Sequence, residues 1–264
     1  MYLELGLKGR RALVTASSKG IGFAVAMMLA REGANVIISS RSSENLKVAS
    51  KKIRDETGSK VEWIVADLTL REDVERLAAK VLEQGGVDIL VFNTGGPKPG
   101  RFMELEDKDW DVAYELLLMS VVKLCRLLAP AMVRRRWGRI VILTSIAIKQ
   151  PEPEIALSNI LRLSLAGLVK QLSIELSRYN VTVNSVMPGY TLTDRLKQYA
   201  MHLSEAEGVA VEEIFGRMAG ETAAGRIAKP EEIASVVVFL ASERASYITG
   251  ALIPVDGGRI KCIF

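Results

Sequence analysis

Cysteine and histidine are scarce in this chain of 264 residues, which has only Cys125, Cys262 and His202. The two cysteines form no C-x-x-C pair, and three such side chains are too few for a structural zinc site. They are also too few for a disulfide framework, which small secreted domains build from several cysteines. We therefore expect a protein of a reducing compartment, the cytoplasm.

Long apolar runs and a strong charge of one sign are missing as well. No segment reaches about eighteen apolar residues without interruption, and residues 1–9 show no basic segment followed by an apolar one, so we expect neither membrane insertion nor secretion. The net charge is only +4, with basic residues spread along the chain, which gives little support for nucleic-acid binding. A composition of 49% hydrophobic and 25% charged residues is typical of a globular protein.

The chain does contain a regular alternation of short β-branched segments with longer segments of helical period. The expected strands span residues 11–15, 35–40, 61–66, 89–92, 139–144, 181–186 and 251–255. The expected helices span residues 21–32, 44–57, 71–84, 107–136, 158–179 and 230–242. Such alternation requires right-handed crossovers between parallel strands. We therefore predict an α/β fold, a single Rossmann domain over residues 1–264 with a doubly wound, seven-stranded parallel sheet and helices on both faces.

Residues 191–228 interrupt this alternation, because they are polar, rich in Gly and Glu, and lack a strand. An insertion after the sixth strand lies at the carboxyl edge of the sheet, where ligands bind, and could be a mobile substrate lid. A surface helix pair without functional motion explains the same composition. Both interpretations stay open at this point.

A glycine-bearing turn, residues 15–22, separates the first strand from the first helix. Glycines allow the backbone to approach a pyrophosphate, and the helix N-terminus directs N–H groups at the anion. The context of strand, turn and helix is the one that a dinucleotide-binding turn requires.

With this turn, the chain resembles the short-chain dehydrogenase/reductase family, and within it the 3-oxoacyl-carrier-protein reductases. The turn matches the family's T-G-x-x-x-G-I-G, except that Ala16 replaces the first glycine and is strained if the position needs a positive φ. Further matches follow in order over nearly the full length. They are Asp67-Leu68, Asn93-Thr94-Gly95-Gly96, Gly138-Arg139-Ile140, Ser145, Asn184, Pro188-Gly189, Arg226, Pro230-Glu231-Glu232-Ile233-Ala234 and Asp256-Gly257-Gly258.

The second strand ends in Ser39-Ser40-Arg41, without the acidic residue that accepts from the ribose 2′-hydroxyl of NAD. Arg41 can instead bind a 2′-phosphate with both prongs of its guanidinium, and Lys19 adds a second charge, so we expect NADP(H). Both cations could also be solvated surface groups. The resemblance and this argument together predict a cofactor site of Thr15, Ser17, Ser18, Lys19, Gly20, Ile21, Gly22, Arg41, Asp67, Leu68, Asn93, Gly95, Arg162, Pro188, Gly189 and Thr191.

The catalytic positions depart from the family pattern. In the family a serine and a tyrosine bind the substrate oxygen, a lysine four residues after the tyrosine lowers its pKa, and an asparagine completes a water relay. The serine corresponds to Ser145, whereas Ser158 stands at the tyrosine position, Arg162 at the lysine position and Leu117 at the asparagine position. A serine hydroxyl is shorter and a far weaker acid than a phenol, and an arginine does not deprotonate. We expect Ser145, Ser158 and Arg162 to be the catalytic residues, with a non-standard proton donor.

Several groups could replace the missing tyrosine. Tyr190 directly follows Pro188-Gly189, although an aromatic residue there is more often packing. Lys149 and Glu154 lie in the loop between the two serines, where charges are usually solvated, and His202 is expected on the surface of the insertion. A bound water relayed through the two serines is the simplest alternative.

Three functions remain open on this basis. The first is an NADP(H)-dependent oxidoreductase acting on a small-molecule carbonyl or alcohol, with an acyl thioester among the substrates that the resemblance allows. The second is a non-catalytic NADP(H)-binding sensor or regulatory protein, and the third is non-redox chemistry with Lys149 or Glu154 as base. The resemblance implies a homotetramer, and residues 113–132 and 160–176 are apolar on more than one face. Arg134-Arg135-Arg136 is either a helix C-terminus favoured by the dipole or a dock for an acidic carrier protein.

Overall fold

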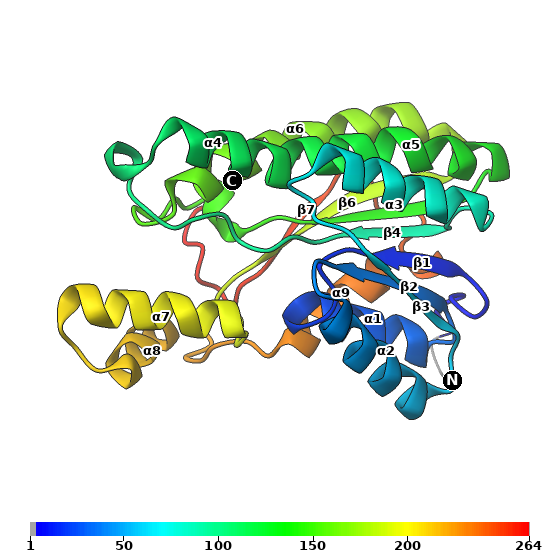
Figure 1. Ribbon diagram of the computed structural model, residues 1–264. Coiled ribbons are helices and arrows are strands. Elements are labelled where there is room, and N and C mark those ends of the chain that lie inside the picture. Colours follow the sequence, from blue (N-terminus) through cyan, green and yellow to red (C-terminus); the bar gives the residue numbers. More distant parts are fainter. Residues whose placement is uncertain (1–3, 264) are drawn as a thin grey trace.

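The computed structural model describes residues 4–263 and contains one sheet of seven parallel strands (Figure 1). Along the sheet the order is β3-β2-β1-β4-β5-β6-β7, and every neighbouring pair is parallel. The strands are β1 (Arg11–Val14), β2 (Asn35–Ser40), β3 (Val61–Val65), β4 (Ile89–Phe92), β5 (Gly138–Leu143), β6 (Val181–Pro188) and β7 (Leu252–Val255). The predicted doubly wound α/β fold is confirmed.

The order of the strands positions the functional site. The chain starts at β1 in the middle of the sheet, proceeds outward to β3, and then returns to β4 on the other side of β1. The crossovers therefore diverge between β1 and β4, and the crevice at the carboxyl ends of these two strands is where such sheets bind ligands. All residues of β4 and β5 are buried, because helices cover both faces of a parallel sheet.

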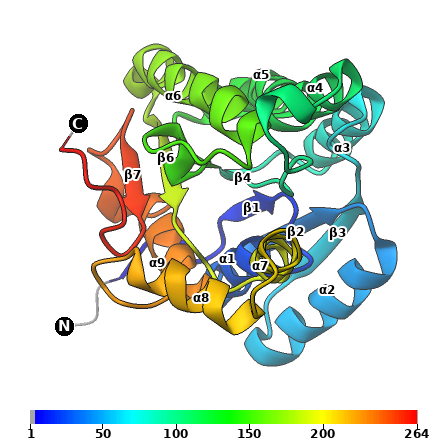
Figure 2. The ribbon, with the colours of Figure 1, turned by 90° about the vertical axis from the view of Figure 1, so that its left-hand side faces the viewer.

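Two layers of helices enclose the sheet (Figure 1, Figure 2). The layer formed by α1, α2 and α9 packs on one face, and the layer of α3, α4, α5 and α6 packs on the other. Their bounds are α1 (Gly20–Arg31), α2 (Ser43–Thr57), α3 (Arg71–Glu83), α4 (Asp107–Tyr114), α5 (Ser120–Arg135), α6 (Ala156–Leu176) and α9 (Pro230–Leu240). Short 3-10 turns span Phe102–Glu104, Ile146–Ile148, Ser177–Tyr179 and Glu243–Ala245.

The prediction of one continuous helix over residues 107–136 is wrong in one respect, because a π-helical turn, Glu115–Met119, separates α4 from α5. Leu117, which sequence reasoning placed at the asparagine position, lies in this turn and is fully buried. Such turns need one extra residue per turn, which side-chain periodicity does not reveal. The combined run Asp107–Arg135 is long and apolar enough to cross a membrane, but half of its most apolar window is buried in the fold, as in a core helix.

Residues 191–228 form the helix pair α7 (Asp194–Glu207) and α8 (Val211–Gly220), which projects from the carboxyl edge of the sheet (Figure 1, lower left). The pair has a small core of its own, formed by Leu196, Ala200, Ile214 and Met218. A bridge between Thr191 and Ala228 joins the two ends of the insertion. The insertion is therefore a helix pair whose two ends lie side by side at its base.

The turn between β1 and α1 contains backbone that is unusual for its residues. Ala16 has a φ of 44°, in the left-handed region, as expected from the glycine that it replaces in the family pattern. Gly22 has an ordinary φ, but a Cβ there would lie 2.4 Å from the Ala16 carbonyl oxygen and 2.8 Å from Asn93 Nδ2. Only glycine at position 22 allows α1 to approach the ends of β1 and β4 this closely.

This packing predicts opposite effects for two substitutions in the turn. We expect Gly22→Ala to lower the free energy of unfolding by about 2 kcal/mol or more, because the clash is with backbone and cannot relax cheaply. Ala16→Gly should raise it by about 0.5 kcal/mol, since relief of the left-handed strain exceeds the added freedom of the unfolded chain. Gly167→Ala on α6 is the control, because nothing lies within 4 Å of the added methyl group. Thermal and chemical denaturation measure all three, and a Gly22→Ala protein as stable as Gly167→Ala would contradict the packing argument.

Candidate functional site

Two adjoining cavities lie at the carboxyl edge of the sheet. The first, about 370 Å³, is bounded by the β1–α1 turn, the end of β2 and the end of β3. The second, about 210 Å³, is bounded by the end of β5, the start of α6, the segment after β6 and the start of α7. Gly96 lines both, so the two cavities meet beside the segment that follows β4.

The predicted site residues divide between these cavities. The residues that line the first cavity are Ser18, Lys19, Arg41, Asp67, Leu68 and Gly95. Those that line the second are Ile21, Ser145, Ser158, Pro188, Gly189 and Thr191. The structure thus brings together twelve of the predicted residues along one continuous crevice, from the end of β2 to the start of α7.

Three other predicted residues direct their side chains at the protein itself. The Thr15 hydroxyl donates to the Asn93 carbonyl oxygen at 2.6 Å, and the Asn93 side chain donates to the Ala16 carbonyl at 3.1 Å. The Ser17 hydroxyl donates to the Val14 carbonyl at 2.6 Å and accepts from the Ser39 N–H at 3.1 Å. These groups hold the β1–α1 turn against the ends of β2 and β4, which shapes the first cavity from behind.

The first cavity has the features of a site for a phosphorylated nucleotide. No side chain caps the N-terminus of α1, so the N–H groups of its first turn are available to an anion. Lys19 and Arg41 are exposed at this cavity, and the described part of the chain pairs neither with a carboxylate. Asp67, which follows β3, also lines this cavity. Its carboxylate accepts hydrogen bonds from the backbone N–H and the hydroxyl of Thr69 at 2.9 and 2.8 Å. A nucleotide with an additional phosphate near Arg41 fits this distribution of charge.

Ser145 and Ser158 line the second cavity from two different elements. Ser145 follows β5, and its hydroxyl accepts from the Ala147 N–H at 3.1 Å, which caps the turn Ile146–Ile148. Ser158 lies in the first turn of α6 and is buried, with 7% of its surface exposed. The two hydroxyls meet at one cavity because β5 ends, and α6 begins, at the carboxyl edge of the sheet.

Arg162 lies one helical turn after Ser158 and is buried behind it. Its Nε donates to the Ser158 hydroxyl at 3.2 Å, its Nη1 donates to the Leu143 and Thr144 carbonyls at 3.2 and 3.4 Å, and its Nη2 donates to Thr94 Oγ1 at 3.2 Å. Burial, with a contribution from the charge of Arg195, lowers the pKa of Arg162 to about 10. The guanidinium still carries its charge at neutral pH, and the Ser158 hydroxyl keeps its own proton for another acceptor.

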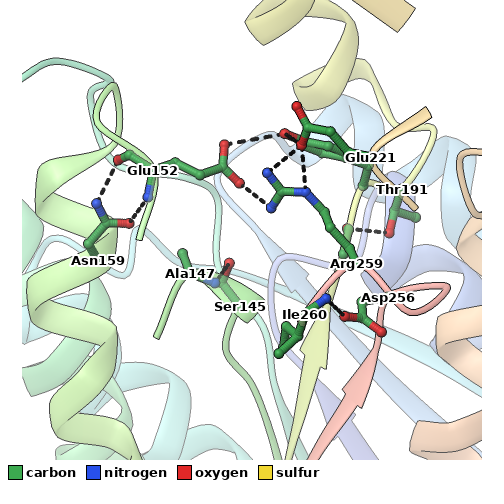
Figure 3. Close-up of polar contacts among 11 residues, drawn as sticks. Ser145, Ala147, Glu152, Asn159, Thr191, Glu221, Asp256, Arg259 and Ile260 are labelled. Carbon is green, nitrogen blue, oxygen red and sulfur yellow. Dashed lines mark hydrogen bonds and ion pairs between the residues drawn. The ribbon is translucent and has the colours of Figure 1, made fainter. Parts of the chain in front are cut away.

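Beside this cavity, a network of ion pairs joins three distant segments (Figure 3), and only Glu152 and Tyr190 of this network line the cavity. Arg259, after β7, lies between Glu152 of the β5–α6 loop and Glu221, which follows α8, with N–O distances of 2.7 Å to each. The Arg259 guanidinium also lies over the Tyr190 ring, 4.2 Å from its centroid. Asn159 on α6 holds the Glu152 backbone, donating to its carbonyl at 2.7 Å. The loop, the insertion and the chain after β7 are therefore fastened together beside Ser145.

Tyr190, which sequence reasoning weighed as a proton donor, belongs to this network. Its hydroxyl lies 3.2 Å from Glu221 and 3.5 Å from Glu152. Burial and the Glu152 and Glu221 carboxylates raise the pKa of Tyr190, and burial with the same Glu152 raises the pKa of Tyr199. A phenol with a raised pKa is a poor acid at neutral pH, so neither tyrosine has the property that the family's tyrosine needs.

The other charged candidates lie outside the second cavity. Lys149 and His202 are exposed, and Glu154 is paired with Arg101 at 2.7 Å. Since neither Lys149 nor Glu154 borders the cavity, the geometry does not favour the non-redox function that required one of them as a base. Arg135, in the basic run, donates to the backbone carbonyls of Gly85 and Val87 in the loop between α3 and β4 and pairs with Asp88 at 3.4 Å.

Sequence reasoning missed several residues of the second cavity, namely Glu152, Thr193, Arg195 and Tyr199, together with Arg259 on its outer side. Thr193 caps α7 and approaches the β1–α1 turn, because a Cβ on Gly20 would lie 3.3 Å from its methyl group. Glu152 comes from the β5–α6 loop, Arg259 from the chain after β7, and the other three from the insertion. The only signal in the sequence for the residues of the insertion was the polar, charged character of residues 191–228.

Comparison with known proteins agrees with this geometry. A family model described as enoyl-(acyl carrier protein) reductase matches residues 15–259. Dehydrogenase/reductase SDR family member 4 of Bos taurus is 38% identical over 97% of this chain and 88% of its own length. The 3-oxoacyl-[acyl-carrier-protein] reductase FabG of Aquifex aeolicus is 34% identical over 97% of this chain and 99% of its own. The structure of L-sorbose reductase from Gluconobacter frateurii, complexed with NADPH and L-sorbose, has a TM-score of 0.94. Its sequence is 34% identical, and the alignment covers 99% of this chain and 100% of the reductase chain.

The network around Arg259 predicts a large loss of stability when it is broken. We expect Arg259→Gln to lower the free energy of unfolding by about 3 kcal/mol, because it leaves the largely buried Glu152 carboxylate unpaired. The matched control is Arg226→Gln, which breaks an exposed pair with Glu232 and should cost less than about 1 kcal/mol. Chemical denaturation measures both losses. Equal losses would show that Arg259 contributes no more than a surface pair.

Proposed function

This chain belongs to the short-chain dehydrogenase/reductase family, and we propose that it is an NADP(H)-dependent oxidoreductase that acts on a carbonyl or hydroxyl group. The observation that carries the proposal is the continuous crevice that joins the uncapped N-terminus of α1, Lys19 and Arg41 to a cavity lined by Ser145. Relatives support it, since L-sorbose reductase and actinorhodin polyketide ketoreductase were both solved with NADPH. The latter has a TM-score of 0.91 and 33% identity.

The residues of the first cavity would hold NADP(H), which supplies or accepts the hydride when it is bound. The N–H groups of the first turn of α1 would bind its pyrophosphate. Arg41 and Lys19 would bind the 2′-phosphate, with Arg41 able to do so through two parallel hydrogen bonds. Asp67 would accept from the adenine amino group.

In the second cavity, Ser145 would donate a hydrogen bond to the substrate oxygen and thereby orient the carbonyl. Ser158 keeps its hydroxyl proton free while it accepts from Arg162, so it can donate to the same oxygen or to a water beside it. The Arg162 charge behind Ser158 stabilises the negative charge that develops on that oxygen. A water relayed through the two serines would be the non-standard proton donor, because the raised pKa of Tyr190 disfavours that residue as the acid.

Two further features of the protein belong to this proposal. We propose cytoplasmic location, and assembly as a homotetramer through α4, α5 and α6. Large apolar side chains exposed along these helices support the assembly, with Ile160, Leu163 and Ile174 on α6 each 48% exposed or more. Sedimentation of the purified protein measures the number of subunits directly.

A non-catalytic NADP(H)-binding protein is the alternative. The observation that favours it is that every nitrogen of Arg162 donates to a protein acceptor, which is also what a purely structural arginine would do. Turnover in the unmodified protein decides between the two. Tight NADPH binding without oxidation of NADPH by any carbonyl compound would favour the sensor or regulatory function.

The catalytic proposal predicts NADPH oxidation in the presence of carbonyl compounds, in a panel that includes sugars, simple ketones and 3-oxoacyl thioesters. With any substrate that is reduced, Ser145→Ala should lower kcat/KM by about 100-fold, because the carbonyl loses its main hydrogen-bond donor. Tyr190→Phe is the control and should change kcat/KM by less than about threefold, since its hydroxyl is held by two carboxylates. A larger loss in Tyr190→Phe than in Ser145→Ala would assign the proton to Tyr190 instead.

The cofactor proposal predicts a selective effect at Arg41. We expect Arg41→Met to weaken NADPH binding about 10-fold or more and to leave NADH binding within about twofold, because only NADPH carries the 2′-phosphate. Fluorescence titration of the two nucleotides measures this without any substrate. Equal losses for both nucleotides would mean that Arg41 contacts the adenosine rather than the phosphate.

A further inference from the structure

Arg195 stands at an unusual position in the second cavity. It is the second residue of α7, where the helix dipole disfavours a positive charge. Its side chain crosses the crevice to the segment after β4, and its Nη2 donates to the Pro97 carbonyl at 2.7 Å. A Cβ on Gly96 would lie 2.7 Å from Arg195 Nε, so only glycine at position 96 allows the guanidinium to approach the backbone here.

The charge of Arg195 has no anion beside it. Two neighbouring cations are paired, since Lys98 in the cavity wall pairs with Asp109 at 2.7 Å and Arg259, outside the cavity, pairs with Glu152 at 2.7 Å. Among residues 4–263, no carboxylate forms an ion pair with Arg195, which remains exposed to solvent. Such an arrangement differs from an ordinary surface cation, because the guanidinium is held in place by the backbone of the crevice.

A second unpaired guanidinium lies nearby, because Arg162 binds only carbonyl and hydroxyl oxygens. The two are close enough for the charge of Arg195 to lower the pKa of Arg162. Arg195 lines the cavity and Arg162 lies behind Ser158, so the two like charges repel each other, and an anion that enters the cavity beside Arg195 relieves this repulsion. The wall of the cavity also carries Glu152, which belongs to a network of two carboxylates, Glu152 and Glu221, and one cation, Arg259. An anion is therefore favoured beside Arg195 rather than beside Glu152.

We propose that Arg195 binds a carboxylate of the substrate, so that the protein acts on oxo acids or the corresponding hydroxy acids. This inference rests on the proposed oxidoreductase function and adds the substrate class. A phosphate of the dinucleotide is the other source of an anion. The substrate is favoured because Arg195 lines the cavity of Ser145 and Ser158, whereas Lys19 and Arg41 line the other cavity. Arg195 is thus a specificity-determining residue at the end of the cavity nearest Gly96.

Binding to the protein saturated with NADP+ tests the proposal without requiring turnover. The probes are 2-oxobutanoate, 3-oxobutanoate and their methyl esters, which differ from the acids in charge, and calorimetry gives each affinity. We expect at least one acid to bind 10-fold or more tightly than its ester. Arg195→Gln should reduce this preference to less than twofold, and Arg195→Lys should retain part of it. Lys197→Gln, an exposed cation of the same helix outside the cavity, is the matched control and should change nothing.

Three outcomes would overturn the inference. The first is that no acid binds to the unmodified protein better than its ester. The second is that the Arg195→Gln protein keeps the preference for acids. The third is that Arg195→Gln lowers only the affinity for NADP+, by 10-fold, which would assign Arg195 to the cofactor. Failure of the oxidoreductase proposal is distinguishable from failure of this one. A preference for acids without any turnover contradicts the oxidoreductase proposal alone, whereas reduction of neutral ketones without a preference for acids contradicts the role of Arg195 alone.

Discussion

The arrangement of the site depends on the hydrogen bonds that the buried guanidinium of Arg162 donates. This guanidinium joins the end of β4 through Thr94, the end of β5 through the Leu143 and Thr144 carbonyls, and the first turn of α6 through Ser158. A buried cation without a carboxylate is costly, and here neutral acceptors offset that cost. The same hydrogen bonds set the distance between Ser158 and the strand that precedes Ser145. The geometry of the second cavity therefore depends on how the charge of Arg162 is accommodated.

The charged side chains on the two sides of this cavity are stabilised in different ways. On one side, Arg259 pairs with both Glu152 and Glu221, and this pairing fastens the β5–α6 loop and the insertion to the chain after β7 (Figure 3). On the other side, Arg195 in the cavity wall and Arg162 behind Ser158 have no carboxylate partner among the residues that the structure describes. A polar ligand with one negative end is the kind of molecule that such a polarised cavity can orient.

Much of the fold was predictable because its signals are local. The β-branched runs and the glycine-bearing turn could be read from the chain itself, whereas the assignment of Ser145, Ser158 and Arg162 to catalytic positions came from the family resemblance. The π turn at Glu115–Met119 was not predictable in this way, since it leaves the apolar pattern of a long helix nearly intact. The insertion was recognised by its composition, but which of its residues face the cavity depends on how α7 crosses the crevice.

The sequence by itself determined the doubly wound sheet and the glycine-bearing turn that precedes α1. Those features depend on periodicity and on residue type at known spacings, which are properties of the chain alone. Only the tertiary structure decided which charges meet. Glu152, Glu221 and Arg259 are far apart in sequence, and Arg195 reaches Gly96 across the crevice. Electrostatic partners depend on distances in space, and these exist only after the sheet and the insertion have packed.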